Sequence, residues 1–348
     1  MIGNGLKYMP KVSVVIPIYG VEKYIERCAV SLFEQTLHDI EFVFVDDCTP
    51  DHSIEILKQV IEKYRPCFEE KNYAVRIERM SSNSGLPTVR RHGVSLCSGE
   101  YVTHCDSDDW VAPNMYELLY KEAKRTDADM VMCGYNMTDG AKVYNVYYHH
   151  ETDKQKLLSN LLTLKESWSV WNKLCRRSMY DDTLIYPTLS MGEDMVLTLQ
   201  LVLKAERIAV VNKALYNYFY NPESITNVQS EVSRYKHWKE SAKNAEIVLF
   251  VFKSCDLADA YAAELVYLRY LQKKLAGNLV KSKKYSKEWL EMFREVNLKT
   301  FKLSEISFND KLKFLSKLLY AKMLSLCRVL FLMFSSLEST YKKCLREE

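Results

Sequence analysis

The sequence predicts an α/β fold in which a mainly parallel sheet is flanked by helices and followed by a helical C-terminal region. Strand-like and helix-like patterns alternate from residue 11 to residue 133. Such alternation implies βαβ units, which build parallel sheets. From about residue 231 onward the pattern is helical almost to the end. With 348 residues, the chain can hold one large domain with an appendage, or two domains.

The expected strands are short apolar runs. Residues 12–16 form the first, and their nearly continuous β-branched sequence is typical of a strand buried on both faces. Further strands are expected at residues 42–45, 73–79, 101–105 and 130–133.

The expected helices carry apolar residues at a helical spacing. Between residues 21 and 36 these are Ile25, Cys28, Ala29 and Leu32, with charged residues on the other side. The next helices are expected at residues 54–64, 86–97 and 113–126.

A change in pattern divides the chain near residue 228. Residues 140–227 are less regular and rich in aromatic side chains, with helical stretches at 153–164 and 194–204. We therefore expect an α/β domain over residues 1–227 and a helical region over residues 228–348.

Composition excludes several classes of protein. The net charge of +3 is too small to indicate a nucleic-acid partner. The ten cysteines are scattered, without zinc spacing, which favours reduced thiols over a disulfide framework. The N-terminus lacks the apolar core of a signal peptide, and no uncharged apolar run reaches eighteen residues. We expect a cytoplasmic protein.

The acidic cluster Asp106-Ser107-Asp108-Asp109 directly follows the expected strand at 101–105. Three carboxylates at a strand end repel each other, and a divalent cation would neutralise them. Hard oxygen ligands suit Mg²⁺ or Mn²⁺ shared with a substrate diphosphate. The alternative is an Asp-rich turn that caps the helix starting near Pro113.

Polar residues also follow the other strands, where ligands of open α/β sheets bind. The first strand ends without a Gly-x-Gly-x-x-Gly sequence, which disfavours a dinucleotide-binding dehydrogenase. The second ends at Asp46-Asp47, where an acid can accept a hydrogen bond from a base or a ribose, or can cap a turn. Arg90, after the third strand, is either an anion partner or a solvated surface residue. Together these ends describe a pocket for a nucleotide diphosphate.

The order of these motifs resembles the family 2 glycosyltransferases of the GT-A fold. The matching segments are Val12-Ser13-Val14-Val15-Ile16-Pro17-Ile18-Tyr19, Gln35-Thr36, Val45-Asp46-Asp47, Asn83-x-Gly85, Arg90, Gly99-Glu100-Tyr101, Asp106-Ser107-Asp108-Asp109, Trp171-Asn172-Lys173-Leu174, Gly192-Glu193-Asp194, Tyr216-x-Tyr218 and Ser224-Ile225. The resemblance covers roughly residues 11–226.

The resemblance implies a donor site. It assigns nucleotide-sugar binding to Pro17, Tyr19, Asp47, Arg90, Asp106, Ser107 and Asp109. Within this set Asp47 is similar to the acid that pairs with the base, and Asp106 to the acid at the ribose and metal. Asp108 would ligate Mn²⁺ or Mg²⁺ at the diphosphate, and Asp109 would lie near the donor sugar or cap the next helix.

The resemblance also implies a catalytic base and an acceptor side. Asp194 matches the base of an inverting transfer, which would convert an α-linked donor into a β-linked product. The alternative for Glu193-Asp194 is the acidic first turn of a helix. Trp171, Glu193 and Tyr218 are candidate acceptor residues, although aromatic side chains are more often part of a core.

The expected function is therefore metal-dependent, hexosyl-type glycosyl transfer. The donor would be a nucleotide diphosphate sugar, UDP-linked, and the acceptor a saccharide or a lipid-linked sugar in surface or exopolysaccharide biosynthesis. Two alternatives are a non-catalytic sugar-nucleotide-binding subunit on the same fold and a sugar nucleotidyltransferase.

A basic amphipathic helix is expected at about residues 309–345. Residues 311–334 contain five basic residues and no acidic one. An apolar stripe runs along Leu312, Leu315, Leu319, Met323, Leu326, Leu330 and Met333. Such a helix can lie peripherally on an anionic membrane, here its inner face, or can pack in a helical bundle or a homo-oligomer.

Overall fold

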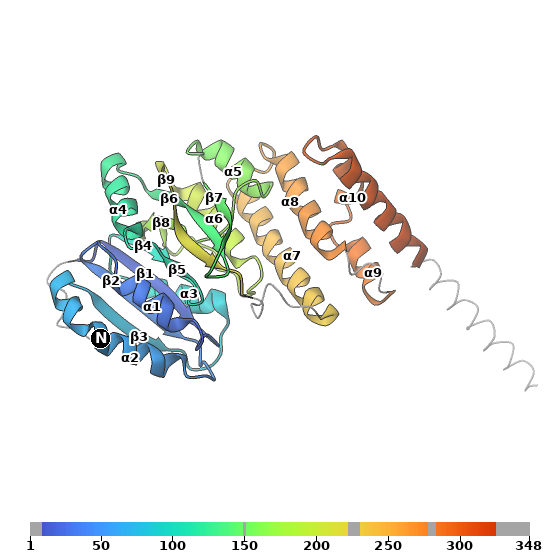
Figure 1. Cartoon of the computed structure of the whole chain (residues 1–348). Coiled ribbons are helices and arrows are strands. Elements are labelled where there is room, and N and C mark those ends of the chain that lie inside the picture. The colour runs from blue at the N-terminus through green and yellow to red at the C-terminus, as the bar shows by residue number, and fades with distance from the viewer. Residues whose placement is uncertain (1–8, 149–150, 222–229, 278–282, 325–348) are drawn as a thin grey trace, which may run out of the picture.

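One mixed β-sheet forms the centre of the α/β part of the chain (Figure 1). The structure, a computed structural model, describes residues 9–148, 151–221, 230–277 and 283–324. Within these residues nine strands pair in the order β3-β2-β1-β4-β8-β6-β9-β5, and β7 pairs with β6. The strands are β1 (Val12–Ile18), β2 (Ile40–Asp46), β3 (Ala74–Arg79), β4 (Tyr101–His104), β5 (Trp110–Val111), β6 (Met130–Thr138), β7 (Val143–Tyr147), β8 (Lys173–Arg176) and β9 (Ile208–Phe219).

The first half of the sheet is parallel, as the sequence predicts. β1 lies between β2 and β4, and β3 extends the sheet beyond β2. The connecting helices are α1 (Ile25–Phe33), α2 (Ser53–Lys71), α3 (Leu86–Ser95) and α4 (Met115–Thr126). Helix α3 packs so closely on β1 that a Cβ atom added at Gly93 would lie 2.4 Å from Val15 Cγ1. The carboxyl ends of β1, β2 and β4 therefore share one edge.

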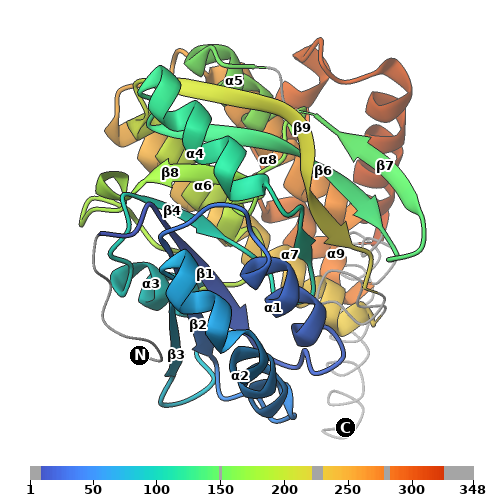
Figure 2. The ribbon, with the colours of Figure 1, turned by 60° about the vertical axis from the view of Figure 1, so that its left-hand side comes forward.

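The second half of the sheet contains antiparallel pairs that the sequence did not predict. β8 runs antiparallel to both β4 and β6, so β4 and β6 point in the same direction. β6 pairs in parallel with β9, while β5 and β7 are antiparallel additions. The β6–β7 hairpin extends beyond the helices at the same edge as the carboxyl end of β4 (Figure 2). The α/β fold is confirmed, and its aromatic-rich segment supplies the antiparallel strands.

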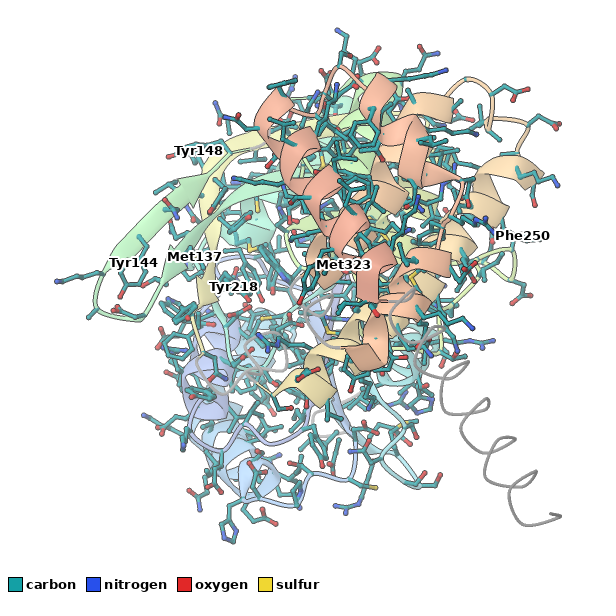
Figure 3. The ribbon with its side chains drawn as sticks, turned by 90° about the vertical axis from the view of Figure 1, so that its right-hand side faces the viewer. Met137, Tyr144, Tyr148, Tyr218, Phe250 and Met323 are labelled. Carbon is teal, nitrogen blue, oxygen red and sulfur yellow. The ribbon has the colours of Figure 1, made fainter. Side chains whose placement is uncertain are left out.

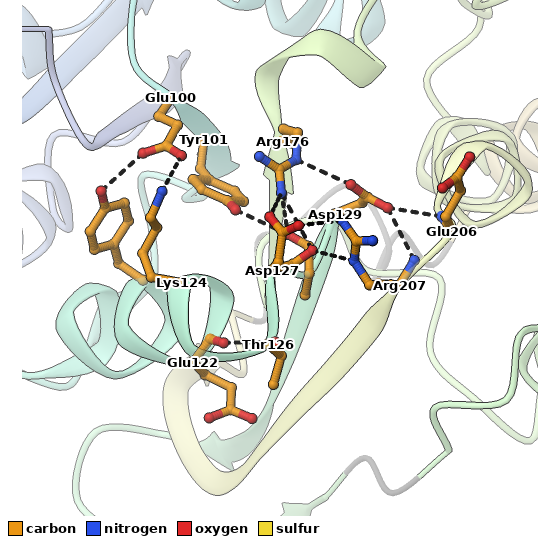
Figure 4. Close-up of polar contacts among 12 residues, drawn as sticks. Glu100, Tyr101, Glu122, Lys124, Thr126, Asp127, Asp129, Arg176, Glu206 and Arg207 are labelled. Carbon is orange, nitrogen blue, oxygen red and sulfur yellow. Dashed lines mark hydrogen bonds and ion pairs between the residues drawn. The ribbon is translucent and has the colours of Figure 1, made fainter.

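Two aspartates fasten the opposite end of the sheet (Figure 4). Asp129 accepts hydrogen bonds from Arg176 Nε at 3.1 Å and from the backbone N–H groups of Glu206 and Arg207 at 2.9 and 3.0 Å. Asp127 accepts from Arg176 Nη2 at 2.9 Å and from Arg207 Nη2 at 2.6 Å. These contacts join the amino ends of β6 and β9 to the carboxyl end of β8. The carboxylates of Asp127 and Asp129 therefore hold strands together at the end of the sheet opposite to the shared carboxyl edge.

A helical C-terminal region follows the sheet, as predicted. Its first helices, α7 (Glu231–Ser254) and α8 (Ala262–Leu275), share one hydrophobic cluster with α5 (Lys154–Leu162) and α6 (Glu193–Lys204), which lie between strands in the chain. Another cluster joins α7 and α8 to α9 (Lys283–Glu291), α10 (Val296–Lys299) and the helix at 308–324. The division near residue 228 stays a prediction.

The helix expected at 309–345 is described only as far as residue 324. The expected continuation of its stripe at Leu326, Leu330 and Met333 lies outside the described residues. Within the described ranges, no helix is both long and apolar enough to cross a bilayer. The eight cysteines in those ranges are free thiols.

Candidate active site

Arg90 joins two of the predicted site motifs. Its Nη2 donates to Asp106 Oδ1 at 2.7 Å, and its Nε donates to Glu193 Oε1 at 2.8 Å. The arginine comes from α3, Asp106 from the end of β4, and Glu193 from the first turn of α6. The Arg90 side chain is only 3% exposed. The fold therefore brings the acidic cluster and the Glu193-Asp194 motif together around one buried cation.

The Arg90 guanidinium carries one positive charge, whereas Asp106 and Glu193 would carry two negative charges if both were ionised. Burial lowers the pKa of Arg90, but the two neighbouring carboxylates outweigh it and the pKa rises, so the arginine stays charged. Burial raises the pKa of Glu193 to about 7 despite its bond to Arg90. The Glu193 carboxyl group is therefore partly protonated near neutral pH.

Asp194 lies in the same electrostatic environment. Its Oδ1 accepts from the backbone N–H of Met195 at 2.8 Å. Burial raises its pKa, and the charge of Asp106 adds to the increase, while Met195, Arg90 and Lys173 oppose it. A carboxylate with a raised pKa is a better proton acceptor near neutral pH.

Lys173 is a second buried cation whose charge acts on Asp194. Its Nζ donates to the carbonyl oxygen of Ser169 at 2.6 Å and to Asn172 Oδ1 at 3.0 Å. Burial lowers its pKa to about 8. The predicted Trp171-Asn172-Lys173 motif therefore contributes a buried positive charge that opposes the rise in the pKa of Asp194.

The three carboxylates of the acidic cluster have different partners. Asp109 is buried, and its oxygens accept from Tyr216 Oη at 2.6 Å and from the backbone N–H of Phe219 at 2.7 Å. Asp108 Oδ2 accepts from Asn221 Nδ2 at 3.3 Å. Asp109 thus fastens the cluster to β9. Its assignment to the nucleotide sugar, like that of the buried Ser107, stays a prediction.

Of the alternative interpretation, the turn is present but the helix cap is not: the Asp109 N–H donates to the Asp106 carbonyl oxygen at 3.1 Å, and strand β5 separates this turn from α4. Helix α4 begins after Asn114, and that residue's side chain makes no capping hydrogen bond.

The remaining pair, Asp106 and Asp108, fits a divalent cation. Burial raises the pKa of Asp108, and the charge of Asp106 raises it further. A cation between them would reverse that repulsion. In the described part of the chain no group of three His, Cys, Asp or Glu side chains could hold a metal alone. Mg²⁺ commonly takes one or two protein carboxylates and completes its shell with phosphate oxygens and water, which suits this pair.

The predicted nucleotide side lies along β1 and β2. Pro17 is buried, and Tyr19, just past the end of β1, is 50% exposed. Asp47 is buried, and its two oxygens accept from the backbone N–H groups of Ser84 at 2.6 Å and Gly85 at 2.9 Å. Gly85 has φ of +80°, a conformation that favours glycine. Asp47 therefore holds the loop that leads into α3 and Arg90, and its pairing with a base stays a prediction.

An aromatic row leads away from the acidic cluster. Trp171 stacks on Tyr216 with ring centroids 4.1 Å apart and lies nearly parallel to Tyr218 at 5.9 Å. Tyr135 meets the edge of Trp171 at 4.9 Å and stacks on Tyr147 at 4.5 Å. Trp171 and Tyr216 are buried, whereas Tyr147 is 39% exposed. Figure 3 shows the hairpin end of this region, where Met137 and Tyr218 lie close together.

Two residues that support the cluster were missed by sequence reasoning. Arg27 on α1 donates from Nη2 to the backbone oxygen of Asp108 at 2.7 Å and lies over the Trp110 ring at 3.9 Å. Asn221 holds Asp108 and accepts from Tyr24 Oη at 3.3 Å. In the sequence, Arg27 is one of several charged residues on the polar side of a helix, and Asn221 belongs to no motif. Their contacts with Asp108 become visible only in the folded chain.

Known proteins resemble this chain in sequence and in fold. Residues 13–187 match the family model for glycosyl transferase family 2. The chain is 28% identical over 299 residues to the uncharacterized glycosyltransferase EpsJ of Bacillus subtilis, and the match spans 83% of each protein. It is 30% identical over 280 residues to the glycosyltransferase GlyA of Streptococcus pneumoniae, a match that spans 77% of this chain but 38% of GlyA. The fold resembles that of S. aureus TarS 1–349 in complex with UDP-GlcNAc, with a TM-score of 0.56 and 19% identity over 90% of this chain and 92% of TarS 1–349.

Proposed function

This chain is a member of glycosyl transferase family 2, and we propose that it transfers a sugar from a UDP-sugar to a saccharide or lipid-linked acceptor during the synthesis of a surface polysaccharide. The observation that carries this proposal is the buried Arg90 bridge between Asp106 and Glu193. It brings a pair of acids suited to a metal diphosphate next to a separate acid suited to proton transfer. Inverting glycosyl transfer needs both.

The donor would lie along the carboxyl ends of β1, β2 and β4. Asp106 and Asp108 would hold a Mn²⁺ or Mg²⁺ ion, which neutralises the departing diphosphate when bound. Arg90 Nη1 is buried and has no hydrogen-bond partner among the described residues, so its two N–H bonds would be open to an anion that enters the site. Tyr19 is exposed enough to stack on a base above Pro17 and Asp47. The TarS complex with UDP-GlcNAc supports a uridine nucleotide as the first choice.

Asp194 would be the base. As the acceptor oxygen attacks the anomeric carbon, its proton passes to the Asp194 carboxylate, and the bond from that carbon to the diphosphate breaks. The bonding electrons leave with the diphosphate, so an α-linked donor gives a β-linked product. The raised pKa of Asp194 suits this task because the carboxylate takes the proton more readily. Glu193 would position the base through Arg90 and does not itself need to transfer a proton.

The aromatic row would receive the acceptor. The donor approaches the Asp106–Asp108 pair from the β1 side, so the acceptor must approach from the side of β6 and β9. There, Trp171 and Tyr218 begin a series of rings that continues through Tyr135 to Tyr147. Aromatic faces pack well against the apolar faces of sugar rings. A polymeric or lipid-linked saccharide would fit such an extended row better than a single small sugar.

The proposal is tested by measuring UDP release from UDP-glucose, UDP-galactose and UDP-GlcNAc with Mn²⁺, together with the thermal stabilisation that each donor gives. The Asp194→Asn variant should lose transfer while it keeps the thermal stabilisation by donor and metal. Donor binding without turnover in both proteins would instead indicate a non-catalytic nucleotide-binding subunit. Pyrophosphate release from UTP and a sugar phosphate would indicate a nucleotidyltransferase.

A further inference from the structure

The helix at residues 308–324 has two apolar faces, and the residues that the structure describes cover only one of them. Phe314, Leu318 and Ala321 are at most 6% exposed and pack in the cluster formed with α7, α8 and α9. A different set is exposed to solvent: Phe308 (74%), Leu312 (48%), Leu315 (39%), Leu319 (59%) and Met323 (52%).

The exposed residues form one continuous stripe. Their spacings of four, three, four and four residues place them on a single side of an α-helix, since a turn takes about 3.6 residues. The buried Phe314 and Ala321 fall on the opposite side. The stripe is therefore not the surface by which this helix packs on the protein. Figure 3 looks onto this helix, with Met323 labelled at its outer side.

Lysines lie along one border of the stripe and further round the helix. By helical geometry Lys311 and Lys322 lie along one border, whereas Lys313 lies about 120° from the centre of the stripe. Asp310 is the only acid between residues 308 and 324, and it pairs with Lys274 at 3.4 Å. Apolar residues flanked by cations on one side of a helix are typical of helices that lie in the surface of an anionic membrane.

We propose that this outer face binds the surface of an anionic membrane, with the stripe inserted among the lipids and the lysines at the headgroups. The helix would lie in the plane of the membrane. A second copy of the chain is a poorer occupant, because an antiparallel symmetric contact through this stripe would place the Lys311 and Lys322 border of one copy against the same border of the other. This inference does not depend on the proposed function, since membrane binding can be measured without turnover.

Flotation of the full chain with lipid vesicles tests the proposal. We expect recovery with phosphatidylcholine vesicles that contain about a third phosphatidylglycerol, and weaker recovery with pure phosphatidylcholine or at high salt. The Leu315→Gln/Leu319→Gln variant should lower the partition constant about tenfold or more, because two inserted apolar side chains are lost. The Lys311→Gln/Lys322→Gln variant should lower it on anionic vesicles only.

A matched control is Phe250→Gln on α7. The Phe250 side chain is 60% exposed, about as much as that of Leu319. Its flotation should equal that of the wild-type chain. The proposal is overturned if the wild-type chain stays unbound, or if the Leu315→Gln/Leu319→Gln variant floats like the wild type. A dimer in sedimentation velocity that this variant dissociates, without vesicle binding by the wild type, would assign the stripe to self-association instead.

Discussion

Arg90 on α3 and Glu193 on α6 share a buried 2.8 Å hydrogen bond although 103 residues separate them in the chain. Because the same guanidinium also holds Asp106, the distance between the donor-side acid and the base-bearing helix is set by one rigid planar group. A lysine could not hold two carboxylates in this fixed geometry. The structure therefore ties the two halves of the candidate site to a single side chain.

Replacing Arg90 by methionine should destabilise the protein by about 3 to 5 kcal/mol, because two carboxylates lose their buried partner. Urea unfolding measures the loss, and transfer activity should disappear with it. Arg125→Met is the matched control, since Arg125 forms an exposed pair with Glu122 and should cost less than about 0.5 kcal/mol. Equal losses for the two variants would contradict a structural bridge at Arg90.

The raised pKa of Glu193 predicts a pH-dependent stability. In the folded protein its pKa is about 7, against an ordinary value of 4.5. The protonated form is favoured by folding, so this contribution is fully present below pH 4.5 and is lost as the pH rises through 7. From pH 5.5 to pH 8 the free energy of unfolding should fall by about 2 kcal/mol more in the wild type than in Glu193→Gln.

Glu100→Gln provides the control of opposite sign. The bonds of Glu100 to Lys124 and Tyr120 lower its pKa although burial opposes them. Its contribution is lost only as the pH falls into the acidic range, so this variant should follow the wild type between pH 5.5 and pH 8. If Glu193→Gln also follows the wild type there, Glu193 stays ionised and the interpretation of its environment is wrong.

The sequence sufficed to predict the parallel half of the sheet. The strands β1, β2 and β4 are buried throughout, and so they appear as mostly apolar runs with few polar residues such as Ser13 and Glu41. The strand β9 was missed, because polar residues such as Asn212, Lys213 and Asn217 interrupt it where it crosses from core to solvent. Strands β5 and β8 are short, and their pairing partners lie far away in the chain. Local pattern carries no information about such partners.

In the candidate site, too, the sequence predicted some features and could not predict others. Motif order placed Asp106 and Asp194 in one site, and the structure brings their environments together through Arg90. What the sequence could not distinguish is the direction in which each neighbouring acid points. Asp108 and Asp109 are adjacent, yet Asp109 is bonded to β9 while Asp108 stays beside Asp106.

Asp108→Asn and Asp109→Asn should therefore have opposite effects. Asp108→Asn removes repulsion from Asp106, so the metal-free protein should be as stable as the wild type or more so. It should nevertheless lose the thermal stabilisation that Mn²⁺ and UDP-sugar give together. Asp109→Asn should lower the free energy of unfolding by about 1 to 3 kcal/mol, because the bond from Tyr216 or from Phe219 is weakened.

Chelation gives an independent check of the same metal site. EDTA should abolish transfer and donor stabilisation, and excess Mn²⁺ or Mg²⁺ should restore both. Undiminished transfer in EDTA, or a full Mn²⁺ response in Asp108→Asn, would argue against a cation at Asp108.

Tyr147 allows the acceptor side to be tested separately from the donor side. It stacks on Tyr135 across the β6–β7 pair, at the exposed end of the aromatic row. Tyr147→Ala should raise the KM for an acceptor, measured with alkyl glycosides, by about two- to tenfold, as loss of one aromatic contact of about 0.5 to 1.5 kcal/mol implies. The KM for the UDP-sugar and kcat should change little, because Tyr147 reaches Tyr216 only through the rings of Tyr135 and Trp171 in this row.

Tyr144 is the control on the same strand, three residues from Tyr147, where β7 shifts its register against β6. It is 55% exposed, and its hydroxyl donates to Asp139. Tyr144→Ala should leave the acceptor KM unchanged. If both variants raise it equally, the hairpin affects the acceptor through its overall stability. If neither does, the acceptor binds elsewhere and the aromatic row is a structural feature of the sheet.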